Sequence, residues 1–443
     1  MKEHSSKSLD MGLTLQDEPK CIPIDDSPAQ ETSATRLGSE PLYDDPPDGG
    51  LHAWTQALMA HLVIFNTWGY IASYGVFQTY YTTALNRPPS DISWIGSIQL
   101  FLLFFIGAAS GRATDAGLFL PTIATGLGFQ LVGVFTTSLC TAYWQVFLSQ
   151  GICLGIGHGL LFCPAMSLIP TYFSKKRALA LAIAASGTAT GGMIYPTVVR
   201  QLLSKIGYGW TIRVLGFIML AVGLTILAFM RTRLPPRKTG PLVEWSAFRE
   251  LTFVLYITGM FLCFWSLYFA FYYVASFARD IIGVTYEDSV SLILLMNGLS
   301  IIGRVVPAYF ADTTFGPLNS MIPFAFSCGI MQYGWSGVHS RESTFAFAGI
   351  YGLTAAPVQA LFPAALSSLT TDLTKTGARM GMGFTIVSFA TLTGPPLAGA
   401  LISQKDGGYL YAQMWGGSSF IAGCLFLMAA RISRSGLKIW YKI

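Results

Sequence analysis

The residues of this chain that could carry chemistry are few, and they lie in strongly apolar sequence. Arg304 is the sharpest candidate, because the nearest acidic residue after it is Asp312, at the end of the same apolar block. A buried guanidinium requires an anion, and its planar fork matches a carboxylate through two hydrogen bonds. We therefore expect Arg304 to bind an anionic group of a ligand. The alternatives are that its side chain reaches the polar end of the block, or that it pairs with Asp312.

Two histidines, His61 and His158, are the other titratable candidates inside apolar blocks. Histidine titrates near neutral pH, so either residue could carry a proton; the alternative is a hydrogen-bonding role in packing. Five more polar side chains stand in apolar surroundings, where an unpaired polar group is costly. They either line a ligand cavity or bond neighbouring helices: Asn66, Tyr74, Gln78, Tyr195 and Asn297.

The elements that position these residues are apolar blocks of about one membrane thickness. The chain is 52% hydrophobic and 11% charged, whereas soluble domains are about 25% charged. Roughly 20 apolar residues span a bilayer, and a helix satisfies its own backbone there. We count twelve blocks, none with Asp or Glu in its interior, near residues 54–81, 91–111, 118–140, 143–166, 177–200, 212–230, 251–275, 289–310, 318–338, 343–368, 379–402 and 412–431. The sequence therefore predicts an all-α membrane protein with twelve transmembrane helices.

Charge distribution predicts the domain organisation and the topology. Residues 1–50 hold eleven acidic and four basic residues, which predicts a disordered cytoplasmic tail. A six-helix bundle is expected over 51–231, a cytoplasmic interdomain loop over 232–250, and a second six-helix bundle with a short cytoplasmic tail over 251–443. Loops and tail on one side of the blocks carry fifteen basic residues against seven on the other, so both termini are expected in the cytoplasm.

The two halves repeat one another in sequence. Asp115 ends the second helix and Asp312 the eighth, while Arg177 opens the fifth helix and Arg379 the eleventh. The offsets are 197 and 202 residues, which indicates a duplicated unit. Each Asp is expected to complement the positive dipole at the start of the helix that follows it. Duplicated halves with a site at their interface are typical of transporters, and these four residues are our candidates for conformational gating.

Several motifs resemble a known family. The stretches 172–180 (YFSKKRALA) and 48–54 (DGGLHAW) are similar to the two hallmarks of the monocarboxylate transporter family in the major facilitator superfamily. Resemblance to its fungal branch comes from residues 66–78, Gly303-Arg304, 377–382 and Gly394-Pro395-Pro396. The resemblance implies two six-helix bundles that work by alternating access, secondary active or facilitative transport of a small organic anion, and contact between Arg304 and the substrate carboxylate.

Three positions depart from the family pattern. Gln78 stands where the better-known animal members carry a lysine, and Ser300 where they carry an aspartate one turn before the arginine. Both groups are held to take part in proton coupling in those members. Ala116 stands where a basic residue usually follows the aspartate. Proton symport is therefore not carried over, and coupling would rest on His61, on His158 or on a protonated substrate.

Three classes of function compete on these observations. A secondary transporter accounts for the helices, the duplication and the motifs; a membrane enzyme would need a catalytic cluster, and a receptor or scaffold a different architecture. The chain has no phosphate-binding Gly-Lys-Ser/Thr loop, so we expect no ATP, and we expect no cofactor, metal or nucleic acid. The expected substrate is monocarboxylate-like or a carboxylated secondary metabolite. The alternatives are export of a neutral secondary metabolite and vitamin uptake. The plasma membrane is expected, with the vacuolar membrane as the alternative.

Overall fold

Helices make up every regular element in the described part of the chain. The computed structural model describes residues 46–72, 74–87, 89–234, 243–370, 372, 375–405 and 407–436. Residues 45–443 form one compact unit. The expected tail (1–50) lies outside the described residues up to position 45, as do positions 235–242 of the expected interdomain loop.

The first half contains the first six expected blocks. In chain order its elements are α1 (Gly50–Ala72), α2 (Tyr74–Ala84), α3 (Pro89–Phe105), α4 (Gly107–Asp115), α5 (Phe119–Thr137), α6 (Tyr143–Val146), η1 (Phe147–Cys153), α7 (Leu154–Tyr172), α8 (Arg177–Ala185) and α9 (Gly187–Phe229). The long α9 covers two passes, because Gly207 inside it has φ +76° and ψ 171° and breaks the helix. Glycine adopts this left-handed conformation without steric cost.

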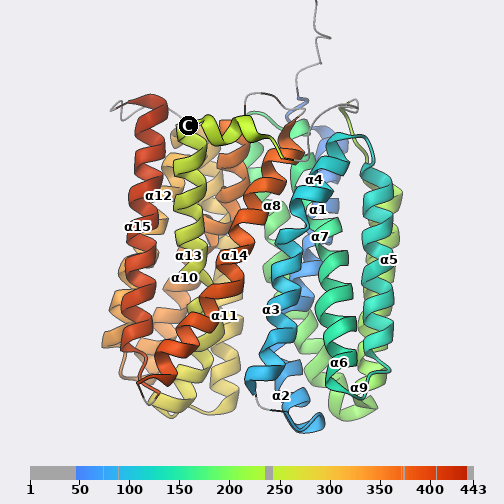
Figure 1. Cartoon of the computed structure of the whole chain (residues 1–443), viewed down its shortest axis with the longest axis vertical. Helices are drawn as coiled ribbons and strands as arrows, with labels where there is room; N and C mark the ends of the chain where they lie inside the picture. The colour runs from blue at the N-terminus through green and yellow to red at the C-terminus, as the bar shows by residue number, and fades with distance from the viewer. Residues whose placement is uncertain are drawn as a thin grey trace, which may run out of the picture. The chain divides into compact units, whose positions relative to one another are not determined.

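The second half contains the other six blocks. Its elements are η2 (Trp245–Arg249), α10 (Leu251–Phe277), η3 (Ala278–Ile282), α11 (Tyr286–Phe310), η4 (Ala311–Phe315), α12 (Pro317–Gly334), η5 (Trp335–Gly337), α13 (Arg341–Leu369), α14 (Thr376–Ser403) and α15 (Leu410–Ser435). In Figure 1 the helices of the first half, blue to green, lie on the right, and those of the second half, yellow to red, on the left. We keep the division into α1–α9 and α10–α15 as a proposal about domains.

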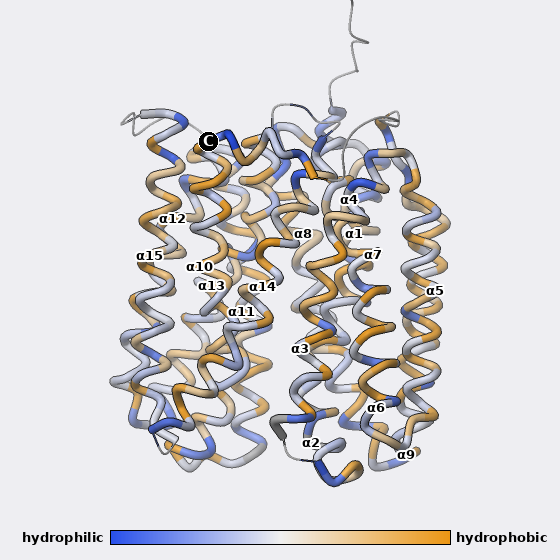
Figure 2. Tube along the Cα trace, in the orientation of Figure 1, coloured by the Kyte–Doolittle hydropathy of each residue, from blue (hydrophilic) through white to orange (hydrophobic). Residues whose placement is uncertain are grey.

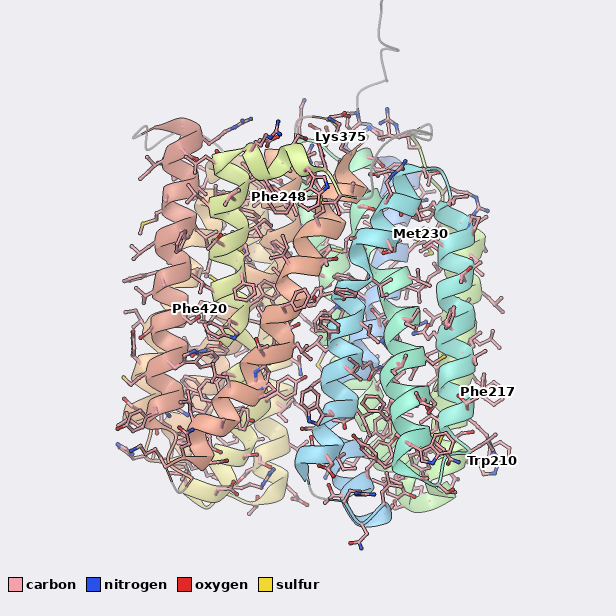
Figure 3. All side chains as sticks on the ribbon, in the orientation of Figure 1. Trp210, Phe217, Met230, Phe248, Lys375 and Phe420 are labelled. Atoms are coloured by element: carbon pink, nitrogen blue, oxygen red, sulfur yellow. The ribbon has the colours of Figure 1, made fainter. Side chains whose placement is uncertain are left out.

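The lengths and compositions of these helices suit a bilayer. Within the described residues, nine helical stretches are long and apolar enough to cross a membrane, and one of them, residues 177–229, covers two passes. Figure 2 shows hydrophilic residues gathered toward the helix ends, with apolar residues along the shafts. Figure 3 labels Lys375 at one end of the bundle and Trp210 at the other. We refer to these as the Lys375 end and the Trp210 end.

Small residues bring helices close together inside the first half. The stripe of Gly151, Gly155 and Gly159 faces α3: a Cβ on Gly159 would lie 2.6 Å from the carbonyl oxygen of Leu102. Such close approach increases van der Waals contact, which is what holds helices together in lipid. Close packing against α3 therefore accounts for the four-residue spacing of this stripe.

Candidate functional site

A narrow cavity of about 30 Å³ lies between the two halves. Seven of its lining residues come from each half, and seven of the fourteen are aromatic. Apolar and aromatic walls with a few polar groups are typical of small-molecule sites, although in this conformation the walls lie close together. The residues are Ile64, Trp68, Phe104, Phe162, Met166, Ala185 and Thr188 from the first half, and Phe264, Tyr268, Arg304, Gln359, Phe362, Pro363 and Phe384 from the second.

The cavity wall has similar chemistry on its two sides. Both halves contribute mostly apolar and aromatic side chains, and Arg304 is the charged residue among the fourteen that line the cavity.

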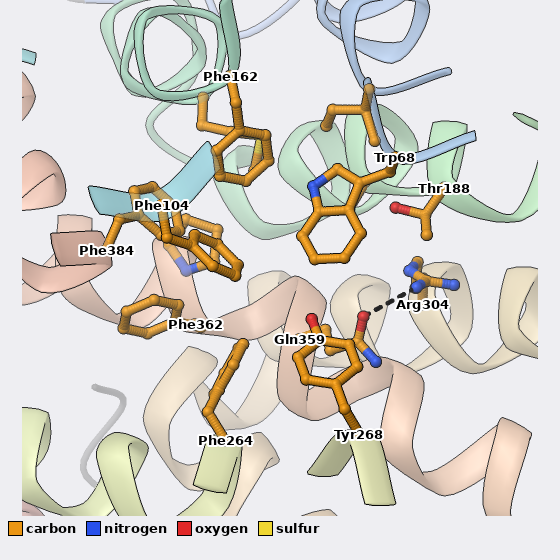
Figure 4. Close-up of a pocket in the computed structure, with 14 residues that line it drawn as sticks. Trp68, Phe104, Phe162, Thr188, Phe264, Tyr268, Arg304, Gln359, Phe362 and Phe384 are labelled. Carbon is orange, nitrogen blue, oxygen red and sulfur yellow. Dashed lines mark hydrogen bonds between the residues drawn. The ribbon is translucent and has the colours of Figure 1, made fainter. Parts of the chain in front are cut away.

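Arg304 is buried in this wall without an anion. Its side chain lies on α11 and the residue is 2% exposed. Nη1 donates to Ser300 Oγ at 2.5 Å and Nη2 donates to Gln359 Oε1 at 3.2 Å, the bond drawn in Figure 4. Nε has no acceptor. Among the described residues no carboxylate lies within ion-pair distance of Arg304, so only neutral dipoles offset the cost of burying its charge.

Both alternative roles for Arg304 disagree with its surroundings. Burial keeps its side chain from the polar end of the helix. Asp312 lies elsewhere, where its two carboxylate oxygens accept from the backbone N–H groups of Ala178 at 2.9 Å and Leu179 at 2.7 Å. Neither alternative therefore supplies a described carboxylate to Arg304.

Asn66 and Tyr195 lie outside the cavity lining. Tyr195 donates to Asn66 Oδ1 at 2.9 Å, and Asn66 Nδ2 donates to the carbonyl oxygen of Met219 at 3.1 Å. These bonds tie α1 to both parts of α9. The two side chains point into the core of the first half. There they bond neighbouring helices, which is the alternative that we gave to lining the ligand cavity.

The other three polar candidates also lie away from the cavity. Tyr74 donates to the carbonyl oxygen of Ile92 and so joins α2 to α3. Asn297 donates to Ile293 on its own helix, and Gln78 is half-buried on α2. Arg304 is thus the one residue of the predicted substrate set that lines the cavity.

The two histidines bond their own half of the protein. His61 Nδ1 lies 2.9 Å from the carbonyl oxygen of Ile183, and Nε2 lies 3.1 Å from Thr190 Oγ1, so α1 is tied to α8 and α9. His158 is fully buried, 3.4 Å from the amide nitrogen of Gln99. Neither histidine is part of the cavity lining.

Asp115 and Asp312 bind helix starts in the opposite half of the protein. Asp115, at the end of α4, accepts from Gly377 N–H at 3.0 Å and Ala378 N–H at 2.7 Å, at the first residues of α14. Asp312 accepts in the same way from the first residues of α8. Our expectation that each Asp serves the helix next in sequence was wrong. The positive helix ends that the two halves bring together at the Lys375 end offer unpaired N–H groups, and these hold the carboxylates.

Arg379 binds the segment between the halves. Its guanidinium contacts Glu244 at 3.0 Å and Glu250 at 2.5 Å, and Lys375 lies 3.3 Å from Glu244. Burial raises the pKa of Glu244, but hydrogen bonding and the charge of Arg379 outweigh burial and hold that pKa below its usual value. Arg177 remains on α8, where its Nε donates to the carbonyl oxygen of Phe173 at 3.3 Å.

The motif before the first helix has a structural role at the Lys375 end. Asp48 Oδ1 accepts from the N–H groups of Ser174 and Lys175, both at 2.6 Å, just before α8. Asp48, Gly49 and Gly50 all have positive φ, which lets this turn place the carboxylate.

Sequence reasoning missed the aromatic wall and Gln359. Aromatic residues in an apolar helix carry no polarity contrast that would single them out. The sequence alone does not separate aromatic residues that face the cavity from those that face lipid or a neighbouring helix.

Duplicated six-helix halves with a cavity between them define a multi-pass membrane transporter. Residues 58–373 match the family model described as Major Facilitator Superfamily. The chain belongs to this superfamily and is one of its transporters. The predicted fold, two six-helix bundles of the major facilitator type, is thereby confirmed.

Its relatives are fungal transporters. An MFS-type transporter of Gibberella zeae is 46% identical over 94% of both chains. The MFS-type transporter dbaD of Emericella nidulans is 35% identical over 86% of this chain and 87% of its own length. The aspyridones efflux protein apdF of the same species is 34% identical over 90% of this chain and 81% of its own. These relatives bear out the assignment to fungal MFS-type transporters.

Solved structures support the fold alone. The human organic anion transporter MFSD10 (TETRAN) superposes with a TM-score of 0.67 at 14% identity, covering 85% of this chain and 98% of that one. The fucose:proton symporter FucP of E. coli has the same TM-score and identity, with coverage of 86% and 98%. At such low identity the likeness says nothing about substrate.

Proposed function

We propose that this protein exports a small organic anion, a carboxylated secondary metabolite, by alternating access of the cavity between its halves. The observation that carries the proposal is the buried guanidinium of Arg304, which faces the cavity with neutral partners and an unpartnered Nε. An anion in the cavity would supply the missing charge and accept two hydrogen bonds from the fork.

Two further observations support this direction and substrate class. The name of one relative, an aspyridones efflux protein, associates that protein with removal of a secondary metabolite. The motifs around residues 48–54 and 172–180 resemble the monocarboxylate transporter family, whose substrates carry one carboxylate. Export from the cytoplasm across the plasma membrane fits both observations.

Export of a neutral secondary metabolite is the second candidate. The aromatic lining favours it, because thirteen of the fourteen lining residues are uncharged. In that case Arg304 would donate to carbonyl oxygens of the substrate instead of a carboxylate. Charge on the transported molecule separates the two candidates.

The test compares metabolites inside and outside cells that lack the protein or express it as wild type, Arg304→Gln or Arg304→Lys. We expect an acid to leave cells only with the wild type, and Arg304→Lys to restore little, because an ammonium keeps the charge but loses the fork. Arg87→Gln is the matched control, since Arg87 is exposed and its contact with Asp91 is 4.0 Å long. Export of an acid at the wild-type rate by Arg304→Gln would contradict the proposal, and export of a neutral compound alone would favour the second candidate.

A further inference from the structure

We propose that Trp68 and Tyr268 form an aromatic clamp that holds a planar, conjugated part of the substrate while its acidic group binds Arg304. The proposal rests on the proposed function and narrows its substrate class, from small organic anions to conjugated acids. It comes from the geometry of the cavity wall, where two nearly parallel rings from opposite halves lie beside the buried cation.

The two rings already form a stacked pair. Their centroids are 6.0 Å apart and their planes differ by 18°. Trp68 lies on α1 and Tyr268 on α10, and both line the cavity. Figure 4 shows the rings pointing toward one another from opposite sides, with Arg304 next to them and most of the phenyl rings further off.

A second stacked pair across the halves has a different environment. Phe104 and Phe384 have centroids 5.5 Å apart and planes 17° apart. Phe384 is also packed by Phe162 at 4.9 Å and Phe362 at 5.3 Å, so this pair belongs to a dense phenylalanine cluster. Trp68 meets Phe104 only edge-on, at 63°. In Figure 4 the Trp68–Tyr268 pair lies next to Arg304, whereas Phe104 and Phe384 lie on the other side of the view.

The pair can exchange its own contact for a guest. Because the rings belong to different halves, their mutual contact must change whenever the halves move. A planar guest between them offers each ring a new face at the usual stacking distance of about 3.5 Å. A saturated ligand of the same size fills the same space but has no aromatic face to stack on the rings. The clamp would therefore bind conjugated ligands more tightly than saturated ones.

The two rings come from opposite halves, Trp68 from α1 and Tyr268 from α10, and both line the cavity between the halves. Arg304 is the charged residue of this lining. A guest with one acidic end would therefore bind in one orientation, with its acid on Arg304 and its rings between Trp68 and Tyr268.

The experiment measures binding of two acids of similar size to the purified full-length protein: 2-naphthoate and its saturated counterpart decahydro-2-naphthoate. For wild type we expect 2-naphthoate to bind about tenfold more tightly, from stacking on two ring faces. Trp68→Leu and Tyr268→Leu should each reduce this preference to about threefold or less and leave affinity for the saturated acid nearly unchanged. Trp68→Phe and Tyr268→Phe keep a ring and should keep most of the preference.

Trp144→Leu is the matched control, because Trp144 is 62% exposed and lies outside the cavity. The clamp is overturned by equal wild-type affinities for the two acids, by a preference that survives in both leucine variants, or by failure of folded wild type to bind either acid. Arg304→Gln tests the proposed function separately and should weaken both acids alike. Unchanged binding of both acids in that variant would overturn the anion site and leave the ring preference to be judged by itself.

Discussion

Arg304 combines burial, charge and a position in the wall between the halves. A guanidinium in such a place is strongly destabilised unless an anion approaches it. Here the hydroxyl of Ser300 and the amide of Gln359 hold two of its nitrogens in place without neutralising them. In the function that we propose, these two contacts would orient the guanidinium before an anion binds.

A carboxylate introduced at position 300 should form an ion pair with Arg304 and compete with the substrate for it. Ser300→Asp places an acid one helical turn before Arg304, within reach of the Nη1 that now donates to Ser300 Oγ. We expect acid transport to fall at pH 7 and to become dependent on pH, because the animal members of the resembled family pair an aspartate at this position with the arginine and couple transport to protons. Recovery should be partial as the pH falls, because protonation of the introduced carboxylate frees Arg304. Ser291→Asp, on an exposed part of the same helix, is the control. Transport by Ser300→Asp that equals wild type at every pH would show that a carboxylate beside Arg304 does not affect the substrate site.

Helix starts at the Lys375 end are where the halves bond to one another. The start of α14 receives Asp115 and the start of α8 receives Asp312, one carboxylate from each half. Each carboxylate satisfies two N–H groups that the helix leaves unbonded and complements its dipole. The two contacts are equivalent under the duplication, so they would form and break together as the halves move.

Loss of these carboxylates should shift the protein toward the conformation that is open at the Lys375 end. A capping interaction of this kind contributes about 1 kcal/mol. Asp115→Asn or Asp312→Asn should therefore change the ratio of the two conformations about fivefold, and the double variant more. Distances between spin labels at the ends of α4 and α14 report this ratio. Asp91→Asn, an exposed residue near the other end, should leave the distances unchanged. Identical distance distributions in wild type and the double variant would count against these contacts as a gate.

Close contact between the halves depends on glycines as well as charges. A Cβ on Gly111 of α4 would lie 2.1 Å from the carbonyl oxygen of Gly377, and a Cβ on Gly381 of α14 would lie 2.2 Å from that of Gly107. The two backbones touch directly along this line. For the molecule as a whole, the Lys375 end closes only because neither helix carries a side chain there.

A side chain at this contact should wedge the halves apart. Gly111→Val should reduce transport at least tenfold, because the protein can no longer close at the Lys375 end, while helix content stays near wild type. Gly128→Val is the control, since a Cβ there meets nothing within 4 Å. Transport in reconstituted vesicles checks both variants. Normal transport by Gly111→Val would mean that closure at this end is not part of the cycle.

The sequence alone predicted the features that the lipid bilayer imposes, which are the apolar helices and the charge inside one of them. It did not predict features that depend on how the helices pack. Lipid requires helices of a set length, so the apolar blocks predicted the passes, and Arg304 stood out as a charge inside an apolar helix. Whether a polar side chain lines the cavity or bonds an adjacent helix depends on the rotation of its helix about the helix axis. The polarity of a single residue does not reveal this rotation. Asn66 and Tyr195 proved to bond one another, and Asp115 and Asp312 to bond the opposite half.

Discrimination between an acid and its neutral amide by Arg304 tests the central claim most directly. The measurement compares the affinities of purified wild type and Arg304→Gln for 2-naphthoate and 2-naphthamide, which share rings and size but differ in charge. Hydrogen bonds to a charged partner contribute about 1.5–3 kcal/mol, so wild type should bind the acid at least tenfold more tightly. Arg304→Gln should bind both about equally. A preference for the acid that persists at full strength in Arg304→Gln would contradict the account.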